Sequence, residues 1–275
     1  MNELDINNPQ LPDFIVPGAD EKKQDEPAKI KVIGVGGGGG NAVNHMYHQG
    51  IGGVSFVLCN TDAQALRNSP VPVKVQLGAK GEGAGNIPEV AKKLAEESAA
   101  EVEALFDDNT RMAFITAGMG GGTGTGAAPV VARIAKEKGV LTVGIVTIPF
   151  LFEGEPKILQ AFAGVEEMRK HVDALLVINN ERLCKIYPDL SWTTAFAKAD
   201  DSLSNAARSI AELVSKDGKI NLDFADVRTT LKDGGAAVIS TGSGEGEHRM
   251  SRAIQNALTS PLLKESDIYG AERVL

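Results

Sequence analysis

The feature that most constrains this chain is a glycine-rich turn at residues 117–126, with the sequence AGMGGGTGTG. An apolar run at 112–116 precedes the turn, and a segment with helical character at 127–138 follows it. Glycines let backbone N–H groups approach phosphate oxygens closely, and the start of the helix adds positive potential. The turn lacks the Gly-Lys-Ser/Thr ending of a Walker phosphate loop. A strand, a turn and a helix in this order predict a nucleotide-binding α/β domain whose phosphates are held mainly by backbone.

A second glycine-rich turn lies near the start of the chain. Residues 34–39, GVGGGG, satisfy the dinucleotide fingerprint, follow an apolar run at 30–35 and open a helix at 41–49. Asp62 lies at about the spacing of the carboxylate that binds a ribose in dehydrogenases. Taken alone, this turn favours an NAD-dependent Rossmann oxidoreductase. That interpretation leaves the turn at 117–126 unexplained, and the sequence has no evident hydride-transfer residues. Two such turns instead favour a polyphosphate enclosed from both sides, with glycines at 78–85 as a third wall.

Strands and helices alternate through the first two thirds of the chain, which predicts a doubly wound parallel sheet, a Rossmann-like α/β fold. We expect strands at 30–35, 54–59, 73–77, 112–116, 141–147 and 174–178, and helices at 41–49, 89–106, 127–138 and 156–170.

The pattern predicts four regions along the chain. Residues 1–28 are polar and rich in proline, which is typical of a flexible tail, and residues 29–193 form the nucleotide-binding domain. Residues 194–218 contain one long helix, 194–216, whose apolar residues recur every seven positions; a central helix between domains and a coiled coil are the alternatives. Residues 219–275 predict a partial α+β second domain with helices at 223–231 and 246–258 and a strand at 236–241. One strand cannot complete a sheet, so we expect the chain to stop within this domain.

Composition excludes several classes of function. The net charge is −8, aromatic residues make up 5% and no dense basic cluster is present, so the chain is not expected to bind nucleic acid. Cys59 and Cys184 lie in apolar runs, which is typical of buried free thiols in a reducing compartment. The histidines do not lie at zinc-ligand spacing, and no apolar run is long enough to span a bilayer. We therefore expect a cytoplasmic protein without a metal-ligand set of its own.

Five motifs, distributed from residue 34 to residue 229, resemble the FtsZ branch of the tubulin/FtsZ family. They are GVGGGGGNAVN at 34–44, NTDAQAL at 60–66, AGMGGGTGTGAAP at 117–129, PFLFEG at 149–154 and NLDFADVRT at 221–229. The resemblance implies a GTPase that converts GTP to GDP and phosphate and polymerises head-to-tail into the division ring at mid-cell. It also implies Mg²⁺ held mainly through the nucleotide phosphates and water. Division proteins would bind a C-terminal tail that these residues do not include.

The same resemblance assigns roles to individual residues. Glu153 would bind the ribose, and Lys157 stands where the family often has an arginine, which would weaken a phosphate clamp. Asn180 would read the guanine, Phe196 would stack on it, and Asp200 would accept hydrogen bonds from it. Core packing for Phe196 and an exposed helix face for Asp200 and Asp201 are the alternatives. The remaining nucleotide contacts would come from Gly37, Gly38, Gly39, Gly40, Asn41, Gly120, Gly121, Gly122, Thr123, Gly124, Thr125, Gly126, Thr147 and Pro149.

The catalytic residues implied by the resemblance are Asn221, Asp223 and Asp226, for which helix capping is the alternative interpretation. Asp200 and Lys216 lie on the long helix, about 24 Å apart along its axis. Asp223 and Asp226 are therefore expected to be too far from the chain's own nucleotide and to meet the nucleotide of another subunit. A polymerising scaffold without useful turnover is a second alternative, motivated by the incomplete second domain.

Overall fold

The computed structural model describes residues 30–107, 109–187, 189, 191–215, 224–240, 242–258 and 270–274 of the 275. Its centre is a parallel sheet of seven strands in the order β3-β2-β1-β4-β5-β6-β7, which confirms the predicted α/β class. The strands are β1 (Ile30–Val35), β2 (Ser55–Asn60), β3 (Val73–Gln76), β4 (Met112–Gly118), β5 (Leu141–Ile148), β6 (Ala174–Asn179) and β7 (Gly235–Ala237). β1 and β4 are fully buried up to Ala117, as strands covered on both faces must be.

The chain winds outward from the middle of the sheet in two directions. It runs from β1 through β2 to the edge strand β3, and then returns to place β4 on the other side of β1. The turns after β1 and β4 therefore leave the same edge of the sheet toward opposite faces. This position is the topological switch point, where parallel α/β sheets bind their ligands.

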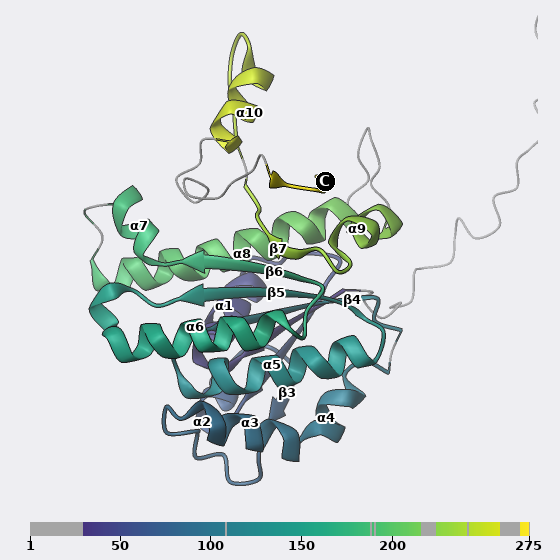
Figure 1. Cartoon of the computed structure of the whole chain (residues 1–275), viewed down its shortest axis with the longest axis vertical. Helices are drawn as coiled ribbons and strands as arrows, with labels where there is room; N and C mark the ends of the chain where they lie inside the picture. Colours follow the sequence, from purple (N-terminus) through teal and green to yellow (C-terminus); the bar gives the residue numbers. More distant parts are fainter. Residues whose placement is uncertain are drawn as a thin grey trace, which may run out of the picture.

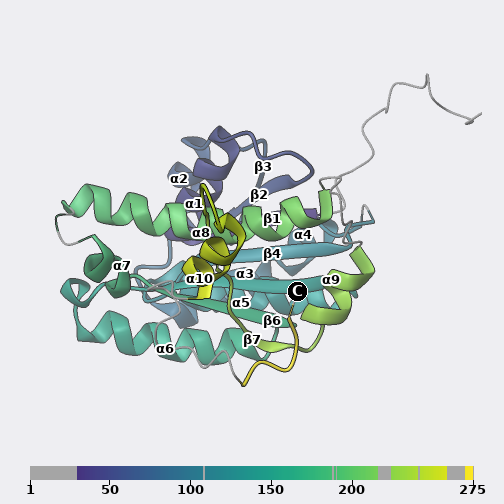
Figure 2. The same cartoon turned by 90° about the horizontal axis from the view of Figure 1, so that it is seen from above.

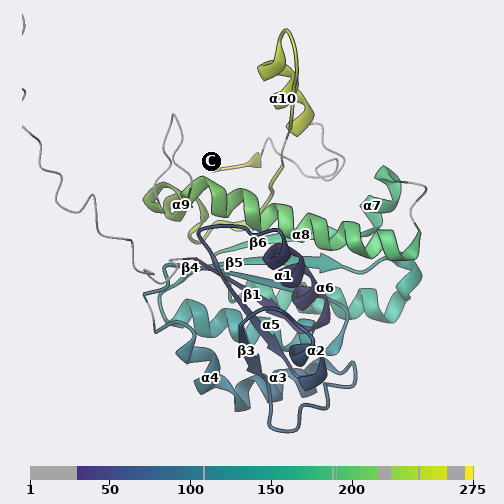
Figure 3. The same ribbon diagram turned by 180° about the vertical axis from the view of Figure 1, so that it is seen from behind.

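Helices cover both faces of the sheet (Figures 1 and 2). One core cluster joins the sheet to α3, α5 and α6, and the other joins it to α1 and α8. Figure 3, which views the molecule from the opposite side to Figure 1, shows α1 and α8 in front of the sheet. The helices, with the 3-10 turn η1, are α1 (Gly36–His48), α2 (Ala63–Arg67), α3 (Pro88–Glu97), α4 (Ala99–Ala104), α5 (Gly122–Glu137), η1 (Leu151–Glu153), α6 (Glu155–Arg169), α7 (Glu181–Ile186), α8 (Trp192–Ser215), α9 (Phe224–Leu231) and α10 (Arg249–Leu258).

Two predicted helices begin earlier than expected. α1 begins at Gly36 and α5 at Gly122, so most of each glycine run forms the first turn of a helix rather than a loop. Glycine is a weak helix former, so the sequence pattern predicted that both helices would begin about five residues later, at 41 and 127. Packing of the glycine backbones against neighbouring segments outweighs that preference.

Two other predictions need correction. The helix expected at 89–106 is divided into α3 and α4 at Ser98, whose side chain accepts a hydrogen bond from the backbone N–H of Gly78. The strand expected at 236–241 is β7, which pairs in parallel with β6 and extends the first sheet. Both differences depend on contacts between segments distant in sequence.

The long helix α8 runs across one face of the sheet (Figure 3). Leu203 and Ile210 are buried toward α1 and β5, and the small residues Ala206 and Ala207 share that face. Within the described residues α8 therefore packs as a layer of the domain. α10 projects away from the sheet, with Met250 75% exposed (Figure 1).

Candidate nucleotide-binding site

The two glycine-rich turns predicted to bind phosphate lie against each other at the carboxyl edge of β1 and β4. A side-chain carbon placed on Gly38 would lie 3.1 Å from Cα of Gly118, and one placed on Gly36 would lie 2.8 Å from the nitrogen of Gly124. Gly36 also has a φ of +74°, a conformation that favours glycine. The structure thus brings together two motifs that lie about eighty residues apart in sequence.

The glycines of the second turn are packed against backbone. A Cβ on Gly126 would lie 2.0 Å from the carbonyl oxygen of Pro88, and one on Gly124 would lie 2.2 Å from that of Gly118. A Cβ on Gly122 would lie 2.8 Å from the nitrogen of Ile87. These positions admit only glycine because protein backbone occupies the space. The residues that pack here are 86–88, directly after the glycines at 78–85 that were expected to supply a third wall.

Hydrogen bonds fix the second turn further. The N–H of Met119 donates to the carbonyl of Thr147 at 2.9 Å, and the N–H of Gly120 donates to the hydroxyl of Thr125 at 2.9 Å. Gln160 Nε2 donates to the carbonyl of Gly120 at 3.0 Å and to that of Gly121 at 3.2 Å. Gln160 belongs to α6, and nothing in its sequence position signalled this role.

A direct side-chain contact joins Thr61, the residue after β2, to the second turn. The hydroxyls of Thr61 and Thr123 lie 2.7 Å apart, and Thr61 is buried. Thr61 was not among the predicted site residues, although it lies in the NTDAQAL motif. The hydroxyls of Thr123 and Thr125 therefore each have a protein partner.

The first turn is different because part of it faces open space. Among the described residues, and apart from the adjoining backbone of α1 itself, no atom lies within 4 Å of a Cβ placed on Gly37 or Gly40. A Cβ on Gly39 would lie 2.2 Å from the carbonyl oxygen of Thr116. Gly37 and Asn41 are exposed. A hollow of about 40 Å³ is lined by Gly36, Gly37, Gly40, Asn41, Asn44, Leu58, Cys59, Asn60, Ala65 and Leu66. The first turn thus exposes backbone to a ligand.

Glu153 and Lys157 pair with each other beside the second turn. Lys157 Nζ lies 3.3 Å from Glu153 Oε2, and Glu153 Oε1 accepts a hydrogen bond from the N–H of Phe150 at 3.0 Å. The carbonyl carbon and oxygen of Lys157 and the ring of Pro149 surround Gly120. The residues predicted to hold ribose and phosphate therefore form one wall, with the carboxylate of Glu153 already hydrogen-bonded.

The residues predicted to read the base gather where α7 approaches α8. The ring of Phe196 is 42% exposed and lies edge-on to Phe150, with the ring centroids 5.3 Å apart. The core-packing alternative for Phe196 is therefore wrong. Asn180 is 5% exposed, and its side-chain oxygen has no hydrogen-bond partner. A buried amide without a partner is an expensive arrangement that a ligand would relieve.

Asp200 lies one turn after Phe196 on the same side of α8. Burial, and then repulsion from Asp201, raise the pKa of Asp200 to about 7. Asp201 is held differently, because His45 Nε2 lies 2.8 Å from one of its oxygens and Lys198 Nζ lies 3.1 Å from the other. The two neighbouring carboxylates thus have separate environments. The raised pKa marks Asp200, rather than Asp201, as the candidate functional group.

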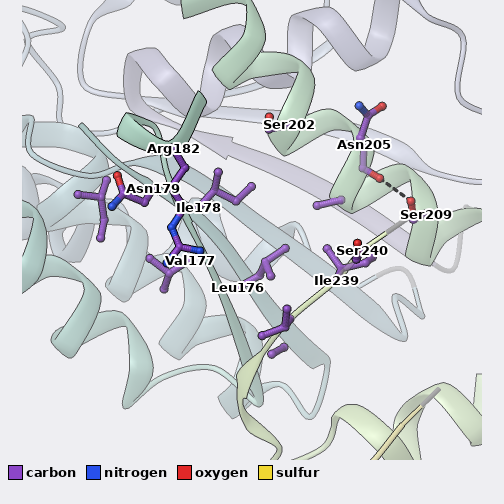
Figure 4. A pocket seen from close by; sticks show the side chains of 14 residues that line it. Leu176, Val177, Ile178, Asn179, Arg182, Ser202, Asn205, Ser209, Ile239 and Ser240 are labelled. Carbon is purple, nitrogen blue, oxygen red and sulfur yellow. Dashed lines mark hydrogen bonds between the residues drawn. The ribbon is translucent and has the colours of Figure 1, made fainter. Parts of the chain in front are cut away.

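A larger pocket of about 290 Å³ lies apart from the glycine turns, between the end of β6, α8 and residues 237–240 (Figure 4). Asn179 lines it from the end of β6 and Arg182 from α7. Ser209, which donates to the carbonyl of Asn205 at 2.8 Å, lines it from α8. None of the predicted site residues lines this pocket. Volume alone therefore does not identify the nucleotide site.

α9 lies at the other edge of the sheet from the glycine turns. Asp226 is exposed in its first turn, while Asn221 and Asp223 fall outside the described residues. The guanidinium of Arg111, immediately before β4, lies 4.0 Å from the ring centroid of Phe224, the first residue of α9. β4 has seven residues, so roughly 20 Å of strand separates this end from the glycine turn.

Other predictions concern metals and thiols. No group of three or more His, Cys, Asp or Glu that could hold a metal ion is found among the described residues. Asp62 accepts hydrogen bonds from the N–H groups of Gln64 and Ala65, so it caps α2. Cys59 is a free thiol whose pKa is raised to about 12 by burial; Cys184 is also free and only partly buried.

None of the helices in the described part of the chain is long and apolar enough to cross a bilayer.

Residues 29–188 match the family described as "Tubulin/FtsZ family, GTPase domain". The chain is 66% identical over 253 residues to the cell division protein FtsZ of Porphyromonas gingivalis, covering 90% of this chain and 55% of that protein. It is 48% identical over 253 residues to FtsZ of Aquifex aeolicus, covering 90% of this chain and 69% of that protein. The chain thus spans little more than half of the first of these relatives.

Solved structures agree with the sequence comparison. An empty FtsZ dimer from M. jannaschii superposes with a TM-score of 0.82 at 45% identity, covering 86% of this chain and 70% of that one. CetZ2 from Haloferax volcanii, a protofilament with bound GTPγS, gives a TM-score of 0.69 at 25% identity, covering 79% and 67%.

Proposed function

Because the chain belongs to the tubulin/FtsZ GTPase-domain family, we propose that it binds and hydrolyses GTP and polymerises head-to-tail. The observation that carries the proposal is the meeting of the two glycine-rich turns at the switch point, with the backbone of Gly37 and Gly40 open to a ligand. The NAD-dependent alternative has lost its support, since Asp62 caps α2 and the family match is to a GTPase domain.

The phosphates bind at the first glycine turn and are enclosed by the second. Gly37 and Gly38 lie in the first turn of α1, where backbone N–H groups have no acceptor within the helix, and with Asn41 they contact phosphate oxygens. Gly40 leaves room for the ligand, and the start of α1 adds its dipole. The second turn is a rigid wall whose N–H groups complete the cradle. Lys157 contributes positive charge from α6, paired with Glu153 until the ribose is bound.

The guanine binds where α7 approaches α8. The exposed ring of Phe196 stacks on the base, and the unpartnered oxygen of Asn180 accepts from it. Asp200 in its ionised form accepts from the ring N–H and the amino group of guanine. An adenine presents no such pair of donors, so these residues give selectivity for GTP.

The divalent cation Mg²⁺ would be held by phosphate oxygens and water. That mode fits the described residues, which offer no cluster of carboxylates. When bound, it offsets phosphate charge. The protein's own contribution is the backbone cradle and the enclosure of the phosphates.

Hydrolysis requires a second subunit in this proposal. α9 and Asp226 lie at the sheet edge opposite the glycine turns, so Asp226 faces the nucleotide of the next subunit in a head-to-tail stack. Asp226, with Asp223 and Asn221 before it, orients and polarises the water that attacks the γ-phosphate. Backbone N–H groups of the glycine turns stabilise the negative charge that develops. The relatives solved as a dimer and as a protofilament support self-association.

The biological role that follows is assembly of the division ring in the cytoplasm at mid-cell, consistent with the relatives named as cell division proteins. We retain the division into an N-terminal tail at 1–28, a GTP-binding domain at 29–193, a central helix at 194–218 and a C-terminal unit at 219–275. Because β7 pairs with β6, the boundary near 219 divides the proposed roles of the two parts and does not divide the sheet. Division partners would bind a segment beyond these residues.

GTP turnover measured against protein concentration tests the proposal. Turnover per subunit should rise with concentration and coincide with sedimentable polymer, and NAD should not compete with GTP for binding. Asp226→Ala should bind GTP normally, hydrolyse it slowly and inhibit wild type when the two are mixed. Full turnover by dilute monomer would contradict the shared site, and polymer without turnover would favour the scaffold alternative.

A further inference from the structure

The first turn of α9 is anchored by two buried residues, with the proposed catalytic carboxylate between them. Phe224 is 8% exposed and Val227 is fully buried, whereas Asp226 is exposed. The spacing of three residues places Phe224 and Val227 on one face of the helix and Asp226 away from it. The direction of the Asp226 side chain therefore depends on how Phe224 is seated.

Phe224 is covered from outside by an arginine that no motif singled out. The guanidinium carbon of Arg111 lies 4.0 Å from the centroid of the Phe224 ring, within the range of a cation–π contact. Arg111 is exposed. The planar guanidinium can lie flat on a ring, which a lysine ammonium cannot do, so this contact restrains both the position and the tilt of Phe224.

Arg111 immediately precedes β4, and Gly118 ends it. Arg111, which covers Phe224, thus lies at one end of the buried strand β4, and the second glycine turn lies at the other end. Arg111 is separated by the length of β4 from the glycine turn of its own chain. Arg111 can therefore affect a reaction only at a site that lies against the α9 edge of the sheet.

We propose that Arg111 is a positioning residue for GTP hydrolysis at the adjacent subunit, because its contact with Phe224 holds the first turn of α9 and thus Asp226. The inference rests on the proposed head-to-tail GTPase. Arg111 acts through Phe224 and does not itself contact the nucleotide.

The first experiment compares Arg111→Ala, Arg111→Lys and the control Arg169→Ala, which removes an exposed arginine from α6. Arg111→Ala should lower kcat about threefold to fivefold, in line with the contribution of an exposed cation–π contact, and leave GTP affinity unchanged. Arg111→Lys should fall between Arg111→Ala and wild type. Arg169→Ala should match wild type. Hydrogen exchange of the α9 amides should be faster in Arg111→Ala and unaltered elsewhere.

The second experiment mixes Arg111→Ala with Asp200→Ala, a variant impaired at the base-binding face. In a mixed filament, the nucleotide face of an Arg111→Ala subunit meets the intact α9 edge of an Asp200→Ala subunit. An equal mixture should then exceed the average of the two separate activities by about twofold, because about one interface in four is fully intact.

The outcomes separate the possible failures. A mixture no more active than the average would overturn the inference, because the loss would then lie in the mutated subunit's own site or fold. So would an Arg111→Ala variant with unchanged kcat, or one with weakened GTP binding. Wild-type protein that shows no concentration-dependent GTP turnover would overturn the proposed function itself, and this inference with it.

Discussion

The two glycine-rich turns look alike in sequence but use their glycines for different purposes. In the second turn, a Cβ on Gly124 or Gly126 would lie 2.2 or 2.0 Å, respectively, from a backbone carbonyl oxygen. In the first turn Gly37 and Gly40 have no neighbour within 4 Å of a Cβ. The second turn is thus glycine-rich so that protein segments can pack closely, and the first turn is partly glycine-rich so that a ligand can approach.

This difference shows why a glycine signature alone does not locate a ligand. The glycines of the GGGTGTG repeat look equivalent in sequence, yet most of them pack against protein, as do the hydroxyls of Thr123 and Thr125. A rigid wall and an open cradle together hold a polyphosphate better than two flexible loops, because the wall loses little conformational entropy on binding.

Gly126→Ala tests the packing side of the comparison and should have the largest effect. The added methyl collides with the carbonyl of Pro88, and α5 can move away only by separating from α3. We expect the free energy of unfolding to fall by about 3 kcal/mol or more, measured by urea denaturation. A loss below about 1 kcal/mol would show that the α3–α5 contact is looser than the distance indicates.

Thr125→Val tests the hydrogen bond that closes the second turn. Valine preserves the shape but leaves the buried N–H of Gly120 without an acceptor. The free energy of unfolding should fall by about 2 kcal/mol, the typical penalty for an unsatisfied buried donor. Thr123→Val is the matched control: Thr123 is only half-buried, so the loss there should be smaller.

Gly37→Ala tests the ligand side of the comparison. A methyl group at Gly37 meets no protein atom, and alanine favours helix, so the stability should change by less than about 1 kcal/mol. GTP affinity should nevertheless fall about tenfold, near 1.4 kcal/mol, because the methyl occupies the phosphate approach. Isothermal titration calorimetry measures this directly. Unchanged affinity would move the phosphates away from the first turn.

The pH dependence of GTP binding sharpens the contrast between the phosphate cradle and the base site. Asp200, with its pKa raised to about 7, is largely protonated at pH 6 and ionised at pH 8. Because the ionised form accepts from guanine, GTP affinity should rise from pH 6 to pH 8 by somewhat less than about tenfold. The sign is opposite for folding, where a raised carboxyl pKa contributes stability at low pH that is lost as pH rises through about 7. Asp200→Asn should bind more weakly and show a flatter profile.

The sequence predicted the sheet well because its buried strands are nearly continuous apolar runs. β1 and β5 were placed within a residue of their observed ends. Residues that depend on distant partners were not predictable in the same way. The break at Ser98 depends on Gly78, and β7 joins the sheet only because β6 offers a free edge.

The candidate site could be proposed from sequence only where motifs carry it. Motif spacing indicated the glycine turns, and the resemblance indicated Phe196 and Asp200. Gln160, Thr61 and Arg111 were missed, because a single glutamine, threonine or arginine is no signal until the fold brings it to a turn or a ring. Asn180 was expected to read the base, and its unpartnered oxygen adds a physical reason.

Both edges of the sheet are short. β3 has four residues and β7 has three, with β7 flanked by Gly234 and exposed. Long flat edges recruit strands from other molecules and lead to aggregation, whereas short edges offer few unpaired backbone groups. A chain with these edges is poorly suited to joining copies side by side through a continuous sheet. In the proposed head-to-tail polymer, growth takes place at the ends of the strands, and short edges protect a concentrated solution against the disordered β-association that would compete with it.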